Sequence, residues 1–221
     1  MCPIQSLICF NGGSAGDFLA GICSEQILGK STYKIHTNGM AGFSGTFKTE
    51  TIKNYYSNHA GVLQICDHTK TVLTNFSNVL PVENTHYFLD FYPTIANQLF
   101  YIDYPDAIVG NIVETYLAKR FQYDRQLLAD TICQQYREPL KSKINKDNII
   151  NVCKINWIKN VKSWRNNSLL EPLYLSDYFD RTKFYNMIEK ICQQKITNFE
   201  KLSENYDNWI SKNSQLRQLF L

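Results

Sequence analysis

A run of small residues near the N-terminus, GGSAGDFL, is the first stretch whose residue types suggest chemistry. It lies between the apolar run Ser6–Phe10 and the amphipathic run Asp17–Gly29, so we expect a buried strand, a tight loop and a helix in succession. Small residues let backbone N–H groups approach a phosphate, and a helix N-terminus adds positive partial charge. The residues predicted to bind an anion are Gly12, Gly13, Ser14, Ala15, Gly16 and Asp17. A plain tight turn, with Asp17 as a helix-capping carboxylate, is an equally good interpretation.

The same loop disfavours two common classes of nucleotide-binding protein. A Walker A loop ends in Lys followed by Ser or Thr, whereas Gly16 is followed by Asp17 and Phe18. The GxGxxG pattern of dinucleotide-binding proteins is missing as well. An ordinary ATPase or GTPase and an ordinary Rossmann dehydrogenase are therefore disfavoured.

Histidine is the residue type best suited to take a proton near neutral pH. His86, in the strand-like run 85–91, is the candidate catalytic base, and a structural hydrogen bond is the alternative role for it. His36, at the end of the predicted strand Tyr33–His36, is a second candidate. The four histidines show neither HxxH nor HxH spacing and the seven cysteines do not cluster, so no metal site is predicted.

Strand-like and helix-like segments alternate along the chain. The clearest later segment is a strand at Leu99–Ile102, followed by Pro105 and by apolar residues at helical spacing from Ile108 to Leu117. Further strands are predicted at Tyr33–His36, 61–66, 70–76, 85–91, Asn148–Ile155 and Leu173–Leu175, and a loop is predicted at Asn38–Gly45. Helices are predicted at Leu127–Tyr136 and after Asp180, which would cap the helix. A last helix is predicted with Phe199, Leu202, Tyr206 and Trp209 facing inward. Alternation of this kind predicts one α/β domain over residues 1–221, with a parallel sheet and ligands at the carboxyl ends of its strands.

Composition limits the partners and the compartment. The chain has 221 residues, is 44% hydrophobic and has a formal net charge of +3, which is too mild to indicate nucleic acid. Seven scattered cysteines without a CxxC motif predict reduced, mostly buried thiols in a cytoplasmic protein. No apolar run approaches the roughly 18–20 residues of a membrane span, so none is expected.

Four segments, in the right order along the chain, resemble landmarks of the sulfotransferases that use 3′-phosphoadenosine 5′-phosphosulfate (PAPS). Ser14, Phe18 and Leu19 fall on matching places of the loop that holds the 5′-phosphosulfate in that family. Pro105 matches the Pro between the family's strand and helix, and Thr85-His86 resembles the Lys-Thr-His element that carries the catalytic base. The segment LEPLYLSDYF resembles the Leu-x-Leu-x-Tyr-Glu-Asp strand that precedes a late helix.

This resemblance implies a three-layer α/β/α fold of the sulfotransferase-like P-loop kind and a PAPS-dependent reaction. A sulfuryl group would pass to a hydroxyl or amine of a small-molecule, glycan or protein acceptor, leaving the product nucleotide PAP. In this scheme Gly12–Asp17 hold the 5′-phosphosulfate and His86 is the base. Asn111, at the place of the family's Ser, holds the 3′-phosphate together with an unassigned Lys or Arg.

The chain departs from the family's pattern at charged positions. Gly13 stands where the family's loop has a basic residue, and Asp103 where it has the Arg that grips the 3′-phosphate, so Asp103 is expected to repel that group. Candidates for the missing positive charge are Lys30, Lys34, Lys48 and Arg120. Together with Asp17, these departures favour one alternative, a catalytically degenerate binding or interaction protein of the same fold. A P-loop kinase or other phosphotransferase is a further alternative, which the missing Lys-Ser/Thr disfavours.

Overall fold

The computed structural model describes residues 4–43, 81–85, 93, 96–121 and 148–221. Within them, four parallel strands form a sheet in the order β4-β1-β5-β6. The strands are β1 (Ile4–Cys9), β4 (Val82–Thr85), β5 (Ala96–Asp103) and β6 (Glu171–Tyr174). Cys9 at the end of β1 pairs with Thr85 and with Tyr101, so the carboxyl ends of β4, β1 and β5 meet at one edge of the sheet. The expectation of a parallel α/β sheet is confirmed.

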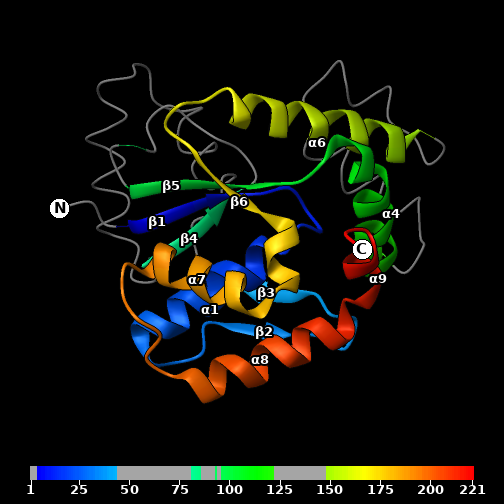
Figure 1. Cartoon of the computed structure of the whole chain (residues 1–221). Helices are drawn as coiled ribbons and strands as arrows, with labels where there is room; N and C mark the ends of the chain where they lie inside the picture. The colour runs from blue at the N-terminus through cyan, green and yellow to red at the C-terminus, as the bar shows by residue number, and fades with distance from the viewer. Residues whose placement is uncertain (1–3, 44–80, 86–92, 94–95, 122–147) are drawn as a thin grey trace, which may run out of the picture.

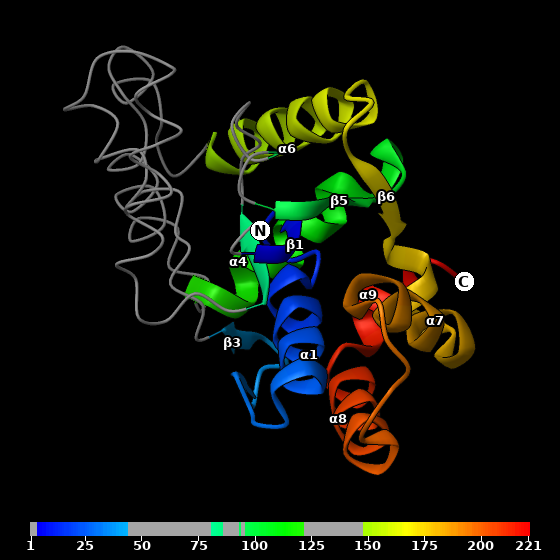
Figure 2. The same cartoon turned by 90° about the vertical axis from the view of Figure 1, so that its left-hand side faces the viewer.

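Helices cover both faces of this sheet (Figure 1; Figure 2). On one face lie α1 (Gly16–Leu28), α7 (Arg181–Cys192) and α8 (Phe199–Lys212). On the other face α6 (Ile149–Arg165) packs against β5 and against α4 (Val109–Phe121). Among the residues described, no helix is long and apolar enough to cross a membrane.

The face with α1 is held by an aromatic cluster. The Phe18 ring stacks on Trp209, with centroids 4.7 Å apart, and on Phe184, with centroids 5.7 Å apart. These three side chains are almost fully buried, and burial of such rings is a large source of stability. The predicted inward positions Leu202, Tyr206 and Trp209 are confirmed, but Phe199 is 59% exposed because it begins α8 at the edge of the cluster.

Several predicted elements agree closely with the structure. The predicted strand and helix around the small-residue loop are β1 and α1, and Gly29 ends α1 in a left-handed conformation. The predicted strand Leu99–Ile102 lies inside β5, and Pro105 precedes a 3₁₀ turn (Asp106–Ile108) that leads into α4. Asp180 caps α7, since its carboxylate accepts a hydrogen bond from the Lys183 N–H. The predicted segments 61–66, 70–76 and 127–136, and most of 85–91, lie outside the described residues.

Two predictions of secondary structure were wrong. The segment Asn148–Ile155 was expected to be a strand, but Ile149–Arg165 form α6, whose buried Ile149, Cys153, Val161 and Trp164 recur at helical spacing. The loop predicted at Asn38–Gly45 contains β3 (Ala41–Phe43), which pairs antiparallel with β2 (Tyr33–Ile35). Gly39, with φ of 79°, allows the tight turn between these strands, which form a separate hairpin rather than joining the sheet.

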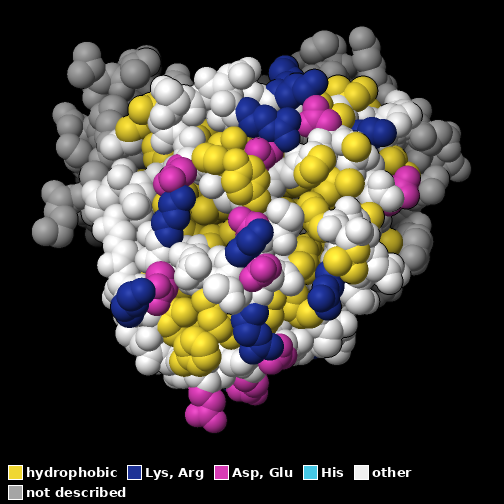
Figure 3. All heavy atoms as spheres, viewed as in Figure 1, with side chains coloured by type: hydrophobic (Ala, Val, Ile, Leu, Met, Phe, Trp, Pro, Cys, Tyr) yellow, Lys and Arg dark blue, Asp and Glu magenta, His cyan; other side chains and the backbone are white. Residues whose placement is uncertain are grey.

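The remaining described elements complete the C-terminal part. A 3₁₀ segment (Leu175–Phe179) joins β6 to α7, and the short helix α9 (Ser214–Gln218) follows α8. On the face in Figure 3, Lys and Arg side chains lie beside Asp and Glu side chains at several places. Two of the ion pairs join Lys190 to Glu171 and Arg181 to Asp207.

Candidate functional site

The loop between β1 and α1 is a tight backbone turn. Gly13 and Ala15 both have left-handed backbone conformations, with φ of 81° and 61°. The Asn11 carbonyl accepts hydrogen bonds from the Ser14 N–H (3.2 Å) and the Ser14 hydroxyl (2.7 Å). Ser14 is fully buried, so its hydroxyl stabilises the turn from within the loop.

Close packing explains two of the glycines. A Cβ at Gly12 would lie 2.7 Å from the Tyr116 ring, and a Cβ at Gly16 would lie 2.1 Å from the Phe10 ring. Both positions therefore exclude a side chain unless a neighbouring ring moves. The small residues at these positions bring Tyr116 of α4 and Phe10 close against the loop.

The loop lies at the point where the strand order reverses. The neighbours of β1 are β4 on one side and β5 on the other, and α1 and α6 cover opposite faces (Figure 1). In open α/β sheets, ligands bind in the crevice that this reversal leaves at the carboxyl ends of the strands. The loops after β1 and after β5 lie on either side of that point.

A buried asparagine joins the two sides. The Asn11 amide donates to the Tyr104 hydroxyl (2.8 Å) and to the Trp157 carbonyl (3.2 Å), and its oxygen accepts from the Asn160 side chain (3.0 Å). Asn11 is only 2% exposed, and burial raises the pKa of the Tyr104 hydroxyl. Because the amide is satisfied on both ends, it fixes the β1 loop against β5 and α6.

The loop after β5 carries charged side chains that pair with one another. Arg165, at the end of α6, donates to Asp103 Oδ1 at 2.9 and 2.7 Å, to Asp106 Oδ1 at 2.8 Å and to the Tyr104 carbonyl at 2.7 Å. The hydrogen bond to Asp103 raises the pKa of Arg165. Burial opposes ionisation of Asp106, but the hydrogen bond and the charge of Arg165, together with Lys162, outweigh it and lower the pKa of that carboxyl. Asp103, expected to stand in the place of the phosphate-binding Arg, thus has its own Arg partner.

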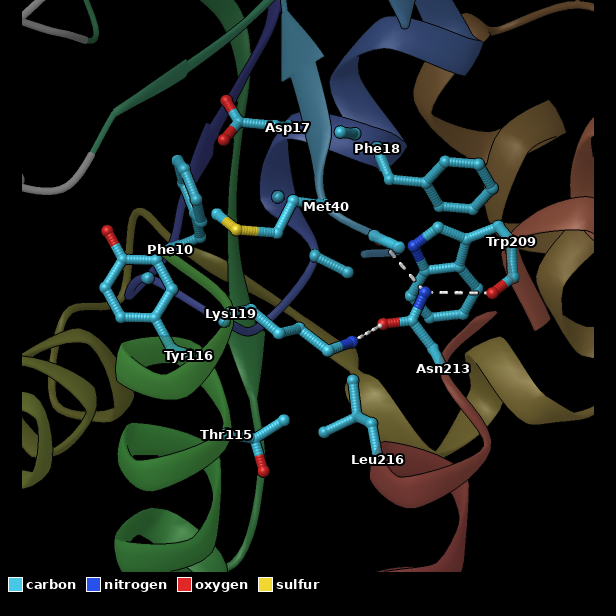
Figure 4. A pocket seen from close by; sticks show the side chains of 16 residues that line it. Phe10, Asp17, Phe18, Met40, Thr115, Tyr116, Lys119, Trp209, Asn213 and Leu216 are labelled. Atoms are coloured by element: carbon cyan, nitrogen blue, oxygen red, sulfur yellow. Dashed lines mark hydrogen bonds between the residues drawn. The ribbon is translucent and has the colours of Figure 1, made fainter. Parts of the chain in front are cut away.

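A hollow opens beside the β1 loop on the side of α4 (Figure 4). It has about 620 Å³ of space, part of it open to solvent. Its wall combines loop backbone, rings and a few polar groups. The lining residues are Phe10, Gly12, Gly13, Ala15, Gly16, Asp17, Phe18, Gly39, Met40, Ala41, Thr115, Tyr116, Lys119, Trp209, Asn213 and Leu216.

Two charged side chains reach this hollow from different helices (Figure 4). Asp17, in the first turn of α1, accepts a hydrogen bond from the Asn84 amide of β4 at 2.8 Å. Lys119, near the end of α4, donates from Nζ to Asn213 Oδ1 at 2.7 Å. Burial lowers the pKa of the Lys119 ammonium, because desolvation disfavours its charged form.

The structure brings together only part of the predicted site. Gly12, Gly13, Ala15, Gly16 and Asp17 line the hollow, whereas Ser14 is buried behind it. Asn111 is exposed in the first turn of α4 and is not one of the lining residues.

His86 lies outside the described residues, next to the buried Thr85 that ends β4. His36 is exposed beside the hairpin. Within the described part of the chain, no group of three or more His, Cys, Asp or Glu is placed to hold a metal ion.

Sequence reasoning missed the residues that carry charge at this edge. Of the cations proposed from the sequence, Lys30 and Lys34 are exposed, and Lys48 is outside the described residues. The structure instead places Lys119 and Arg165 near the two loops. The partners of these cations, Asn213 and Asp103, are 94 and 62 positions away in sequence, so no local pattern signals either pair.

Comparison of the chain with protein-family models, with curated proteins and with solved structures found no significant match.

Proposed function

We propose that this chain is a sulfotransferase-like protein that binds PAPS with the β1 loop and transfers its sulfuryl group to a hydroxyl or amine acceptor. The observation that carries the proposal is the position of Gly12–Asp17. The loop follows a central parallel strand, opens the first helix at the reversal of strand order, and borders a hollow. The sequence motifs that resemble those of the sulfotransferases, and their order along the chain, support the same proposal.

The residues around the hollow fit the phosphosulfate end of such a nucleotide. A Cβ at Gly13 would lie 2.8 Å from the Tyr116 Cβ, so glycine lets the loop backbone pack closely against α4, and the N-terminus of α1 favours negative charge. When bound, PAPS supplies an activated sulfuryl group to the acceptor. The protein's part is then to hold the phosphosulfate with the loop, to keep the acceptor in the hollow, and to take the acceptor's proton at His86.

The residues at the end of β5 fit the 3′-phosphate less well. Arg165 is already bonded to two carboxylates and a carbonyl, and Asn111 is exposed on α4. This arrangement, with the Asp17 carboxylate in the wall of the hollow, favours a second candidate function. In it the chain binds an anionic ligand with the same loop but catalyses no transfer.

Titration calorimetry distinguishes these proposals from a phosphotransferase. We expect PAP to bind more tightly than ATP with magnesium, because the Lys of a Walker A loop is missing. Tight binding of ATP with magnesium and none of PAP would instead support a P-loop kinase.

A variant at the predicted base separates the enzyme from the non-catalytic binder. His86→Ala should reduce sulfuryl transfer by about 10²–10⁴-fold and leave PAP affinity nearly unchanged, since a positioned base acts in the transition state. PAP binding without transfer by the native protein to any acceptor would support the non-catalytic candidate.

A further inference from the structure

We infer that Lys119, held by Asn213, is the cation that pairs with the sulfate or phosphate group of the ligand in the hollow beside the β1 loop. Lys119 would thus supply from α4 the positive charge that the loop lacks at Gly13. The inference rests on the proposed function only for the identity of the nucleotide. Recognition of an anion by Lys119 is tested separately below.

Asn213 fixes the Lys119 ammonium in place. Asn213 is 5% exposed, and its Nδ2 donates to the Gly39 carbonyl at 3.0 Å and to the Trp209 carbonyl at 2.9 Å. Because both donors of the amide are used, its oxygen must face Lys119 Nζ, which lies 2.7 Å away. The Asn38 side chain also donates to the Lys119 carbonyl at 2.9 Å. The structure therefore orients the side chain and secures its backbone.

The charge of Lys119 has no matching anion in the described part of the chain. Its side-chain partner there is a neutral amide, and none of the ion pairs among the described residues includes it. A half-buried ammonium without a carboxylate is unfavourable, and an anionic ligand would offset this penalty. Two of the three ammonium protons remain for such a ligand after the bond to Asn213.

The surroundings of Lys119 place an anion against the loop. Lys119 lines the same hollow as Gly12, Gly13 and Gly16, and its side chain reaches across toward Asn213 (Figure 4). Asp17 also lines the hollow, so the wall is polarised, with the Asp17 carboxylate on α1 and the ammonium on α4. A ligand bound there would direct its sulfate or phosphate to Lys119 and a hydroxyl or amine to Asp17.

The test compares Lys119→Gln with Lys119→Arg, which keeps the charge, and with Lys154→Gln, which removes an exposed lysine of α6. Binding of PAP and of inorganic pyrophosphate is measured by calorimetry at low salt. We expect Lys119→Gln to weaken binding of both probes about tenfold or more, because hydrogen bonds to charged groups are the strong ones. Lys119→Arg should retain most of the affinity, and Lys154→Gln should change it less than about twofold.

Two probes keep the outcomes separate. Lys119-dependent binding of pyrophosphate without binding of PAP would support the role of Lys119 and contradict the PAPS proposal. Equal binding of PAP by the native protein and by Lys119→Gln would overturn the role of Lys119 and leave the PAPS proposal standing. Failure of the native protein to bind either probe would overturn both. If Lys119→Gln does not fold, NMR of the native protein tests whether Lys119 contacts the anion. Pyrophosphate must then shift the Lys119 Nζ signal, and an unmoved signal overturns the inference.

Discussion

The loops that follow β1 and β5 lie at the same edge of the sheet but differ in how they use charge. The β1 loop has no charged side chain from Phe10 to Gly16 and borders a hollow. The β5 loop has Asp103 and Asp106, and both are bonded to Arg165 from α6. The β1 loop therefore presents backbone to a hollow, whereas the charged side chains after β5 are engaged in internal ion pairs.

Neither loop supplies a positive charge of its own, since Gly13 is uncharged and Asp103 is acidic. The cations at this edge come from the helices. Arg165 neutralises Asp103 at the β5 loop, and Lys119 reaches the hollow at the β1 loop.

The largest expected effect concerns the packing of the β1 loop. Gly16→Ala should lower the free energy of unfolding by about 2–3 kcal/mol, because the new Cβ overlaps the buried Phe10 ring. The matched control is Gly29→Ala, which meets no neighbour and should lose only about 1 kcal/mol from its left-handed conformation. Urea denaturation measures both, and an equal loss for the two variants would contradict the packing role of Gly16.

The next effect concerns the ion pairs of the β5 loop. Arg165→Met should lower the free energy of unfolding by about 1–2 kcal/mol, since two carboxylates and a carbonyl lose their donor. Lys201→Met, which removes an exposed pair with Glu204 in α8, should change it by less than about 0.5 kcal/mol. PAP affinity should stay unchanged in both variants. A large loss of PAP binding in Arg165→Met would mean that the β5 loop contacts the nucleotide.

A smaller effect tests whether Asp103 repels the ligand. The sequence suggests that an Arg at this position would strengthen PAP binding, but the Asp103 carboxylate is engaged with Arg165. Asp103→Asn should therefore change the dissociation constant for PAP by less than about twofold, since the charge of Arg165 offsets most of the repulsion between the Asp103 carboxylate and a phosphate. Calorimetry showing markedly tighter PAP binding would restore the expectation that Asp103 faces the 3′-phosphate.

The smallest effect is a pH dependence. The pKa of Asp106 lies below its ordinary value of 3.8, so the folded state favours the ionised carboxylate. The stability that Asp106 contributes should be complete above about pH 4 and should disappear as the pH falls through its lowered pKa. The difference in unfolding free energy between the native protein and Asp106→Asn should shrink between pH 6 and pH 3. A constant difference would show that the interaction with Arg165 does not stabilise the ionised Asp106 carboxylate in the folded state.

The sequence predicted local elements better than long-range contacts. The strand, loop and helix around GGSAGDFL were predictable because apolar runs and small residues follow one another within 30 positions. The segment Asn148–Ile155 was misread because its β-branched residues are typical of strands, whereas packing against β5 and α4 favours a helix.

In the candidate site, too, local features were predictable from the sequence and long-range contacts were not. The small residues that line the hollow were predictable as a loop from the local pattern of the sequence, and the inward Trp209 from helical spacing. Lys119 and Arg165 were not, because their positions depend on Asn213 and Asp103, which only the fold brings near. Charges that arrive from distant helices leave no periodic or local mark in a sequence.

A structure of the protein with PAP tests the central claim most directly. The account predicts that the 5′-phosphate lies against the backbone of Gly12–Asp17, in the hollow that Lys119 borders, with the Arg165–Asp103 pair intact. The contrary result is PAP bound at the end of β5 with Arg165 released from Asp103, or a hollow that stays empty at saturating PAP.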